Sequence, residues 1–169
     1  FKNRKIMAVY TPKQFVKQVS SIRSSFSSQI QDALEYSLMI ANEQFDENFD
    51  NEGFTDMHHQ PWNTNHPQTI KDKGHDTILK GKTGKLRRSQ DNRLFRTGGY
   101  RAARVFYKVI GKDGKDYAHK MNFGFINQNG SYVPKRKFIG RSKKLDARVR
   151  SVFVSAVKKA FNTNYTIGR

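Results

Sequence analysis

One short segment of the sequence has residues typical of a nucleotide phosphate site. Gly81-Lys82-Thr83 matches the end of a phosphate-binding loop, whose backbone N–H groups and lysine hold nucleotide phosphates. That loop also needs a glycine five positions before the glycine of Gly-Lys-Thr, where this chain has Asp76. We therefore expect no nucleotide hydrolysis here and interpret the segment as a turn on a basic surface.

A histidine-rich segment, residues 53–76, contains the residue types that bind zinc. Its imidazoles and carboxylates are His58, His59, His66, His75, Asp56, Asp72 and Asp76. Structural zinc sites have closely spaced ligands that usually include cysteine, and this sequence has no cysteine. We interpret the segment as a polar solvated loop and expect no metal. A small hydrolase that uses these histidines is the least favoured alternative.

Other residues that could perform catalysis lack the necessary neighbours. The acidic residues gather between Asp32 and Glu52, where the pattern indicates a solvated helix face rather than two carboxyl groups in one pocket. Ser89 and Ser142 do not have the surroundings of a nucleophile elbow. We predict that the chain is not an enzyme and needs no cofactor.

Two clusters of basic residues indicate a polyanionic partner. They contain Lys80, Lys82, Lys85, Arg87 and Arg88 in the first, and Lys135, Arg136 and Lys137 in the second. Charge of one sign at this density repels itself unless salt or a polyanion screens it. We predict that these side chains face DNA phosphates without reading bases, and a solvated basic loop is the alternative.

The charge is divided unequally along the chain. The net charge of the 169 residues is +18, yet residues 1–54 hold six basic and seven acidic side chains. No Lys or Arg occurs between Asp32 and Glu52. Such asymmetry favours a basic surface for nucleic acid and a separate acidic patch. No apolar run approaches the ~20 residues of a membrane span, and no apolar signal core follows residues 1–5, so we expect a soluble protein.

Two helices bracket the sequence. Thr11-Pro12 is a helix start, and apolar residues then recur every three or four positions from Phe15 to Phe49, which predicts a helix over 12–50. The serines between 20 and 28 weaken its first half, so a break there is an open alternative. Ser142 can cap a second amphipathic helix over 143–161, followed by a tail at 162–169.

Between the helices the pattern is that of short strands. We expect strands at 94–97 and 100–110, separated by Gly98-Gly99, and the second of them shows the alternation of a strand. The Asp113-Gly114 pair predicts a hairpin at 112–115 leading to a strand at 117–125, and a short strand follows at 132–133. We expect one α+β domain, in which two helices pack on a small, mainly antiparallel sheet formed from residues 78–140.

Three segments, in this order, resemble one known family. The first is Leu79 through Ser89, with the core Thr83-Gly84-Lys85-Leu86-Arg87-Arg88-Ser89. The second is Tyr117-Ala118 followed by Asn122-Phe123-Gly124, and the third is Val133-Pro134-Lys135-Arg136-Lys137-Phe138-Ile139-Gly140, just before the last helix. With Trp62 after a long helix, they resemble the phage virion morphogenesis proteins, which complete tails and join them to heads. The resemblance covers about residues 12–161.

This resemblance implies a homo-oligomeric ring in the phage neck, with six copies favoured over twelve. Its partners would be the tail tube protein, a head-closure or connector protein, and DNA passing through the lumen, with no membrane. The implied place is the virion, after assembly in the host cytoplasm. For subunit contacts we propose residues of the acidic stretch and two aromatics: Glu43, Asp46, Glu47, Asp50, Trp62 and Phe138.

The main rival is a basic nucleic-acid-binding module without catalytic activity. In that case Phe106 and Tyr107, on a predicted strand, would serve as stacking platforms for bases. A ring-forming protein assembles without nucleic acid, whereas a binding module stays monomeric and binds DNA with steep salt dependence.

Overall fold

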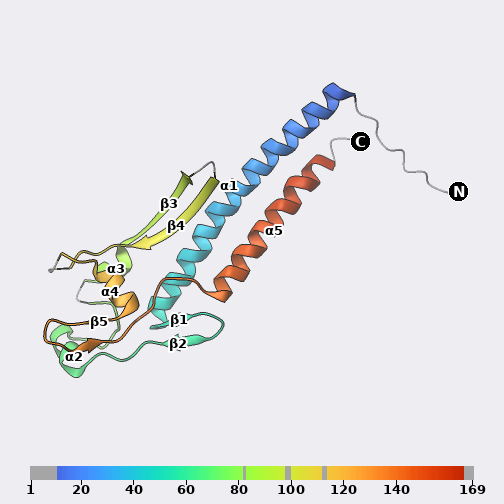
Figure 1. Cartoon of the computed structure of the whole chain (residues 1–169). Helices are drawn as coiled ribbons and strands as arrows, with labels where there is room; N and C mark the ends of the chain where they lie inside the picture. The colour runs from blue at the N-terminus through green and yellow to red at the C-terminus, as the bar shows by residue number, and fades with distance from the viewer. Residues whose placement is uncertain (1–10, 82, 98–99, 112–113, 166–169) are drawn as a thin grey trace.

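The chain folds around one long helix. The computed structural model describes residues 11–165 except 82, 98–99 and 112–113. Its elements are α1 (Pro12–Asp50), β1 (Gly53–Thr55), β2 (His59–Pro61), α2 (Pro67–Lys73), α3 (Lys85–Arg88), β3 (Gln90–Thr97), β4 (Tyr100–Tyr107), α4 (Tyr117–Phe123), β5 (Phe125–Ile126), β6 (Tyr132–Val133) and α5 (Lys143–Tyr165). Figure 1 shows an elongated molecule in which α1 and α5 lie side by side. The predicted α+β class is confirmed.

The start of α1 is the predicted hydroxyl cap. The Thr11 Oγ1 accepts a hydrogen bond from the Gln14 N–H at 3.4 Å, and the Gln14 side chain accepts one from the Thr11 N–H at 2.9 Å. The helix continues through residues 20–28, so the break considered there does not occur. Arg101 of β4 supports this stretch by donating to the Ser27 carbonyl and to Gln31.

The last helix also begins where the sequence predicts. The Ser142 Oγ accepts a hydrogen bond from the Leu145 N–H at 3.3 Å, and α5 continues to Tyr165, beyond the predicted end at 161. It runs antiparallel to α1, because Arg148 near its start pairs with Glu43 near the end of α1. Small buried residues, Ala33 on α1 and Ala156 on α5, line the contact between the helices.

The predicted single sheet is divided into three antiparallel two-stranded ribbons: β1–β2, β3–β4 and β5–β6. In the longest, Gln90 pairs with Tyr107 and Thr97 with Tyr100. Gly98-Gly99, which we expected to separate the two strands, lies outside the described residues. The strand expected at 100–110 ends at Tyr107, and the strand expected at 94–97 begins earlier, at Gln90.

The prediction of a strand at 117–125 is wrong, since residues 117–123 form α4. Asp116 is the reason, because its side chain caps the helix by accepting the Ala118 N–H at 3.0 Å. The supposed partner strand contributes one isolated bridge, between Ile110 and Asp116. Residues 112–113 of the expected hairpin lie outside the described part of the chain.

The long loop expected at 53–76 contains structure of its own. Residues 53–55 and 59–61 pair as the β1–β2 hairpin, and residues 67–73 form α2. His66 caps α2 by accepting the Gln68 N–H at 3.2 Å. Several of the polar residues that suggested a loop are therefore used as caps and turns.

The main core lies at the C-terminal end of α1, where the irregular middle of the chain folds against it. It contains Phe45, Phe49, Trp62, Ile78, Leu79, Leu86, Tyr107, Val109, Ala118, Met121 and Phe138. Phe138 is at its centre, with ring centroids 5.2 Å from Phe49 and 5.1 Å from Tyr107. Among the described helices, none is both long enough and apolar enough to cross a bilayer.

Candidate functional site

The three segments that carry the family resemblance meet in this core. Leu86 of the first, Ala118 of the second and Phe138 of the third are buried in one cluster. Gly124 ends α4 with a φ of 80°, and a Cβ there would lie 3.0 Å from the Lys135 backbone nitrogen. These three segments therefore contribute to the core of the fold.

Two buried amide side chains hold the segment around Phe138 in place. Asn48 of α1 donates to the Phe138 carbonyl at 3.1 Å and accepts the Thr55 N–H at 3.0 Å. The Asn122 Oδ1 accepts the N–H groups of Phe138 and Ile139 at 3.0 and 3.2 Å. The backbone of this irregular segment thus obtains inside the protein the partners that water would otherwise provide.

Trp62 and Phe138, which we predicted at a subunit contact, lie inside the chain's own core. Phe138 has 0% of its surface exposed and Trp62 has 7%. The Trp62 indole N–H donates to the Lys137 carbonyl at 2.8 Å. Their burial leaves these rings almost no surface for a neighbouring subunit.

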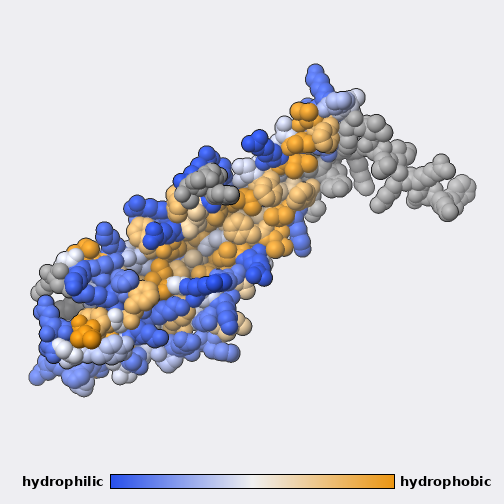
Figure 2. Space-filling model, in the orientation of Figure 1, coloured by the Kyte–Doolittle hydropathy of each residue, from blue (hydrophilic) through white to orange (hydrophobic). Residues whose placement is uncertain are grey.

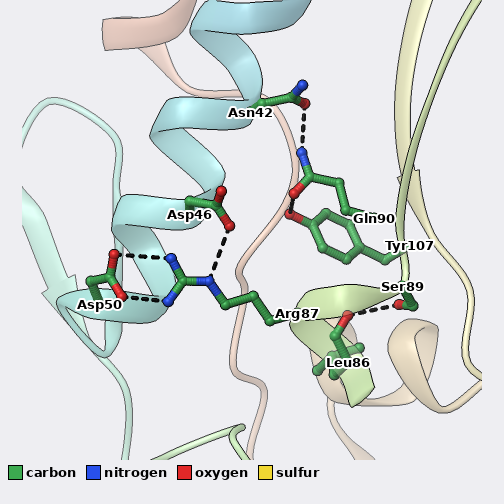
Figure 3. Close-up of polar contacts among 8 residues, drawn as sticks. All are labelled: Asn42, Asp46, Asp50, Leu86, Arg87, Ser89, Gln90 and Tyr107. Atoms are coloured by element: carbon green, nitrogen blue, oxygen red, sulfur yellow. Dashed lines mark hydrogen bonds and ion pairs between the residues drawn. The ribbon is translucent and has the colours of Figure 1, made fainter. Parts of the chain in front are cut away.

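Figure 3 shows how the first basic cluster meets the acidic end of α1. The Arg87 guanidinium donates two hydrogen bonds to the Asp50 carboxylate and a third to Asp46 at 3.1 Å. The hydrogen bond from Arg87 lowers the pKa of the Asp50 carboxyl. Nearby, Gln90 donates to Asn42 at 2.6 Å and accepts from the Tyr107 hydroxyl at 2.9 Å. One patch of contacts therefore attaches the Leu79–Ser89 segment to α1.

The other two acidic residues predicted at the subunit contact also have partners within the chain. Glu43 pairs with Arg148 at 2.6 Å and Glu47 with Lys144 at 3.8 Å, both from α5. With Asp46 and Asp50 both bound to Arg87, the four carboxylates share three cations of this chain. These carboxylates remain partly exposed to solvent, but each already has a cationic partner in its own chain.

The residues predicted to face DNA divide into two groups. Arg136 is buried and donates to the carbonyls of Asn63 and Thr64 at 3.2 Å, and burial lowers its pKa. Lys137 lies 3.8 Å from the centre of the Phe54 ring, and burial lowers its pKa too. Together with Arg87 they have structural contacts. The exposed members are Lys80, Lys85, Arg88 and Lys135, while Lys82 lies outside the described residues.

A cleft of about 800 Å³ beside α3 is lined by Ile78, Leu79, Lys80, Thr83, Gly84, Arg87 and Arg88 with the end of α1. Its two acids, Asp50 and Glu52, are occupied, because Glu52 accepts the Ile78 N–H at 2.7 Å. Neither carboxylate is placed as a free general base. In the described residues, no three His, Asp or Glu side chains are grouped to hold a metal ion.

Two groups of exposed apolar side chains lie at opposite ends of the molecule, a feature that sequence reasoning missed. The α1 patch consists of Phe15, Val16, Val19 and Phe26, with exposures from 39% to 62%. The distal patch consists of Phe123, Ile126 and Tyr132, with exposures from 64% to 71%. Figure 1 places the start of α1 and the β5 region at opposite ends, and Figure 2 shows apolar side chains at the α1 end.

The sequence does contain a signal for the α1 patch. The apolar stripe of the predicted 12–50 helix extends to Phe15, and the predicted 143–161 helix is too short to cover its whole length. No comparable signal identifies the distal patch, because its residues come from α4, β5 and β6.

Comparison with protein-family models, with curated proteins and with solved structures gives no match. What this chain does must therefore be argued from its own residues and geometry.

Proposed function

We propose that this chain is a non-catalytic structural protein of the neck of a tailed phage, where a ring of copies completes the tail and joins it to the head. The resemblance in three segments, and their meeting in one core, support this proposal. The ring has six copies in preference to twelve, contacts the tail tube protein and a head-closure or connector protein, and lets DNA pass. It is assembled in the host cytoplasm and remains in the virion.

The observation that carries the proposal is the pair of apolar patches at opposite ends of an elongated subunit. A ring with cyclic symmetry needs two different surfaces on each subunit, because every contact is head to tail. The α1 patch and the distal patch are different surfaces, and each exposes large apolar side chains to water. Contact between the α1 patch of one copy and the distal patch of the next would bury both.

The charges have a smaller part in this arrangement than the sequence alone indicated. Glu43, Glu47, Asp46 and Asp50 already have cationic partners in their own chain. We therefore assign the subunit contact to the apolar patches, and keep these carboxylates as polar residues beside it.

The test measures assembly by mass photometry and negative-stain electron microscopy, with and without the tail tube protein. Wild type should form closed rings, whereas Val19→Glu in the α1 patch and Ile126→Glu in the distal patch should each prevent closure. A mixture of the two variants should give one-to-one dimers, since each retains the surface that the other lacks. Met39→Glu is the matched control, because Met39 is 64% exposed on α1 outside both patches.

A wild-type chain that remains monomeric at high concentration with the tube protein present would refute the proposal. Unchanged rings in both patch variants would instead remove the assigned contact. Turnover of any substrate by the purified protein would contradict its non-catalytic character.

The second candidate, a basic nucleic-acid-binding module, is favoured by the arginines of the β3–β4 ribbon. Of the two aromatic rings expected to stack on bases, Tyr107 is not accessible, because it is buried and its hydroxyl donates a hydrogen bond to Gln90. Phe106 lies beneath two guanidinium groups. A monomer that binds DNA tightly, without any ring, would favour this candidate.

A further inference from the structure

The β3–β4 ribbon carries four arginines in two directly opposed pairs. Arg93 is opposite Arg104, and Arg96 is opposite Arg101. In a ribbon alternate residues face opposite sides, so the two pairs lie on different faces. Like charges placed directly across an antiparallel pair destabilise it.

One face of the ribbon is held against α1. Arg101 donates to Gln31 at 2.9 Å, Gln90 donates to Asn42 at 2.6 Å, and the Tyr107 ring enters the core. These residues share one face by the register of the strands. The other face, with Arg93, Arg104 and Phe106, therefore points away from α1. We call it the outer ribbon face.

The two guanidinium groups of the outer ribbon face are held near one aromatic ring. The Arg93 and Arg104 carbons lie 5.1 and 5.8 Å from the centre of the Phe106 ring. Asp91, the acid on this face, bonds to Arg93 at 3.0 Å. Arg104 is exposed, and it forms no ion pair with a carboxylate among the described residues.

We propose that the outer ribbon face binds the phosphates of double-stranded DNA, with Arg93 and Arg104 as the contacting cations. Phosphates would relieve the repulsion between the paired arginines. A two-stranded ribbon also fits the dimensions of the major groove. Duplex DNA is favoured over single strands because the guanidinium groups lie over the Phe106 ring, the position that a stacked base would take.

This inference deepens the proposed function. It rests on that function only in taking the bound DNA to be the DNA that passes through the ring. It assigns DNA contact to the β3–β4 ribbon and no longer to Arg87 and Arg136, because these two arginines bind other parts of their own chain. Lys108, exposed immediately after β4, adds a further cation near this face.

The test is fluorescence anisotropy of a labelled 20-base-pair duplex, titrated with the purified full chain at several salt concentrations. For Arg93→Gln combined with Arg104→Gln we expect affinity to fall about tenfold or more near 0.1 M salt, and the slope of log K against log salt to fall by about two. Arg150→Gln with Lys158→Gln is the control, because it removes the same charge from exposed positions on α5. We expect it to weaken binding by about threefold at most, through long-range charge alone.

Two single variants separate binding from stability. Arg104→Gln removes the opposed charge, so its melting temperature should stay level or rise while its DNA affinity falls. Asp91→Asn removes an anion beside the DNA and should raise affinity several-fold, while its melting temperature falls because Arg93 loses its partner. An arginine with only a structural role would instead lower the melting temperature and leave affinity unchanged.

The inference is overturned if the double ribbon variant binds duplex as tightly as the control, or if wild type prefers a 20-nucleotide single strand. Ring formation is recorded on the same samples. Rings that fail to bind DNA would refute this inference and leave the proposed function standing. Monomers that bind DNA through the ribbon would support the inference and refute the proposed function.

Discussion

Arg87 and Asp50 are 37 residues apart in sequence and form a two-point ion pair, which attaches α3 to the last turn of α1. Asp46, one turn earlier, accepts a third hydrogen bond from the same guanidinium. The pair is partly exposed, with 41% of the Arg87 side chain and 62% of the Asp50 side chain accessible. Water and salt therefore screen it, and its effect on stability is modest.

Replacing Asp50 by Asn should lower the free energy of unfolding by about 1 kcal/mol at neutral pH, the upper range for an exposed pair with two-point geometry. Urea unfolding measures the change. Asp50→Asn combined with Arg87→Gln should lower stability by little more than Arg87→Gln alone, because Arg87→Gln already removes the contact with Asp50 along with the contact with Asp46. Strictly additive effects would show that the two side chains act independently.

The same ion pair predicts an acid-sensitive contribution. Hydrogen bonding to Arg87 lowers the pKa of Asp50 from the ordinary value of 3.8, so the folded protein binds this proton less readily than the unfolded chain does. The stabilisation is present above the ordinary value and is lost as the pH falls through the lowered value. The stability difference between wild type and Asp50→Asn should therefore be constant near neutrality and shrink below about pH 4. A difference that grows on acidification would contradict this assignment.

Asn48 should be among the residues most sensitive to truncation. Asn48→Ala leaves the Phe138 carbonyl and the Thr55 N–H without their side-chain partner, and we expect a loss of about 2–4 kcal/mol. Chemical denaturation followed by tryptophan fluorescence would report it, because Trp62 lies in the same core. Asn63→Ala is the control, since its side chain is exposed and its backbone carbonyl is kept. Equal stability of the two variants would refute the role given to Asn48.

Phe138 and Phe123 provide a matched pair of phenylalanines. Phe138→Ala removes a fully buried ring and should cost about 3–5 kcal/mol, enough to threaten folding of a domain this size. Phe123→Ala, at 64% exposure, should change stability by at most about 0.5 kcal/mol but weaken ring formation. Thermal melts and mass photometry on both proteins separate the core from the distal patch. Loss of stability in Phe123→Ala without loss of assembly would contradict this division.

Arg136 tests whether a basic residue in a basic cluster acts on DNA or on the fold. Arg136→Gln should lower stability by about 1.5–3 kcal/mol, because the guanidinium donates to two loop carbonyls. Its affinity for duplex DNA should equal that of Lys135→Gln, measured under conditions where both proteins are folded. A selective loss of DNA affinity in Arg136→Gln would restore this residue to the DNA surface.

The helices could be predicted from sequence because their signals are local. Thr11-Pro12 and Ser142 mark the two starts, and the apolar period sets the buried face. The 117–125 segment was predicted as a strand because it follows the hairpin signal of Asp113-Gly114, and residues 117–123 instead form α4. The side chain of Asp116 was the local signal that favoured the helix.

The environment of the site residues could not be predicted, because it depends on contacts distant in sequence. Asn48 meets the Phe138 carbonyl across 90 residues, and Trp62 meets the Lys137 carbonyl across 75. Charge alone does not distinguish Arg136, which is buried, from Lys135, which is exposed. A basic cluster indicates that a polyanion is near, and only the packing shows which of its members have surface available.

The first turns of α1, which precede the serines at 20–28, are almost entirely exposed, and Figure 1 shows the start of this helix extending past the end of α5. A helical segment without tertiary packing is only marginally stable in water, and the serines that follow these first turns are weak helix formers. In the ring that we propose, joining subunits through this part of α1 would therefore cost the conformational entropy of keeping it helical. Heating should then release neighbouring copies of the proposed ring before the core around Phe138 melts, which would make the contact between subunits the part of the assembly most sensitive to temperature.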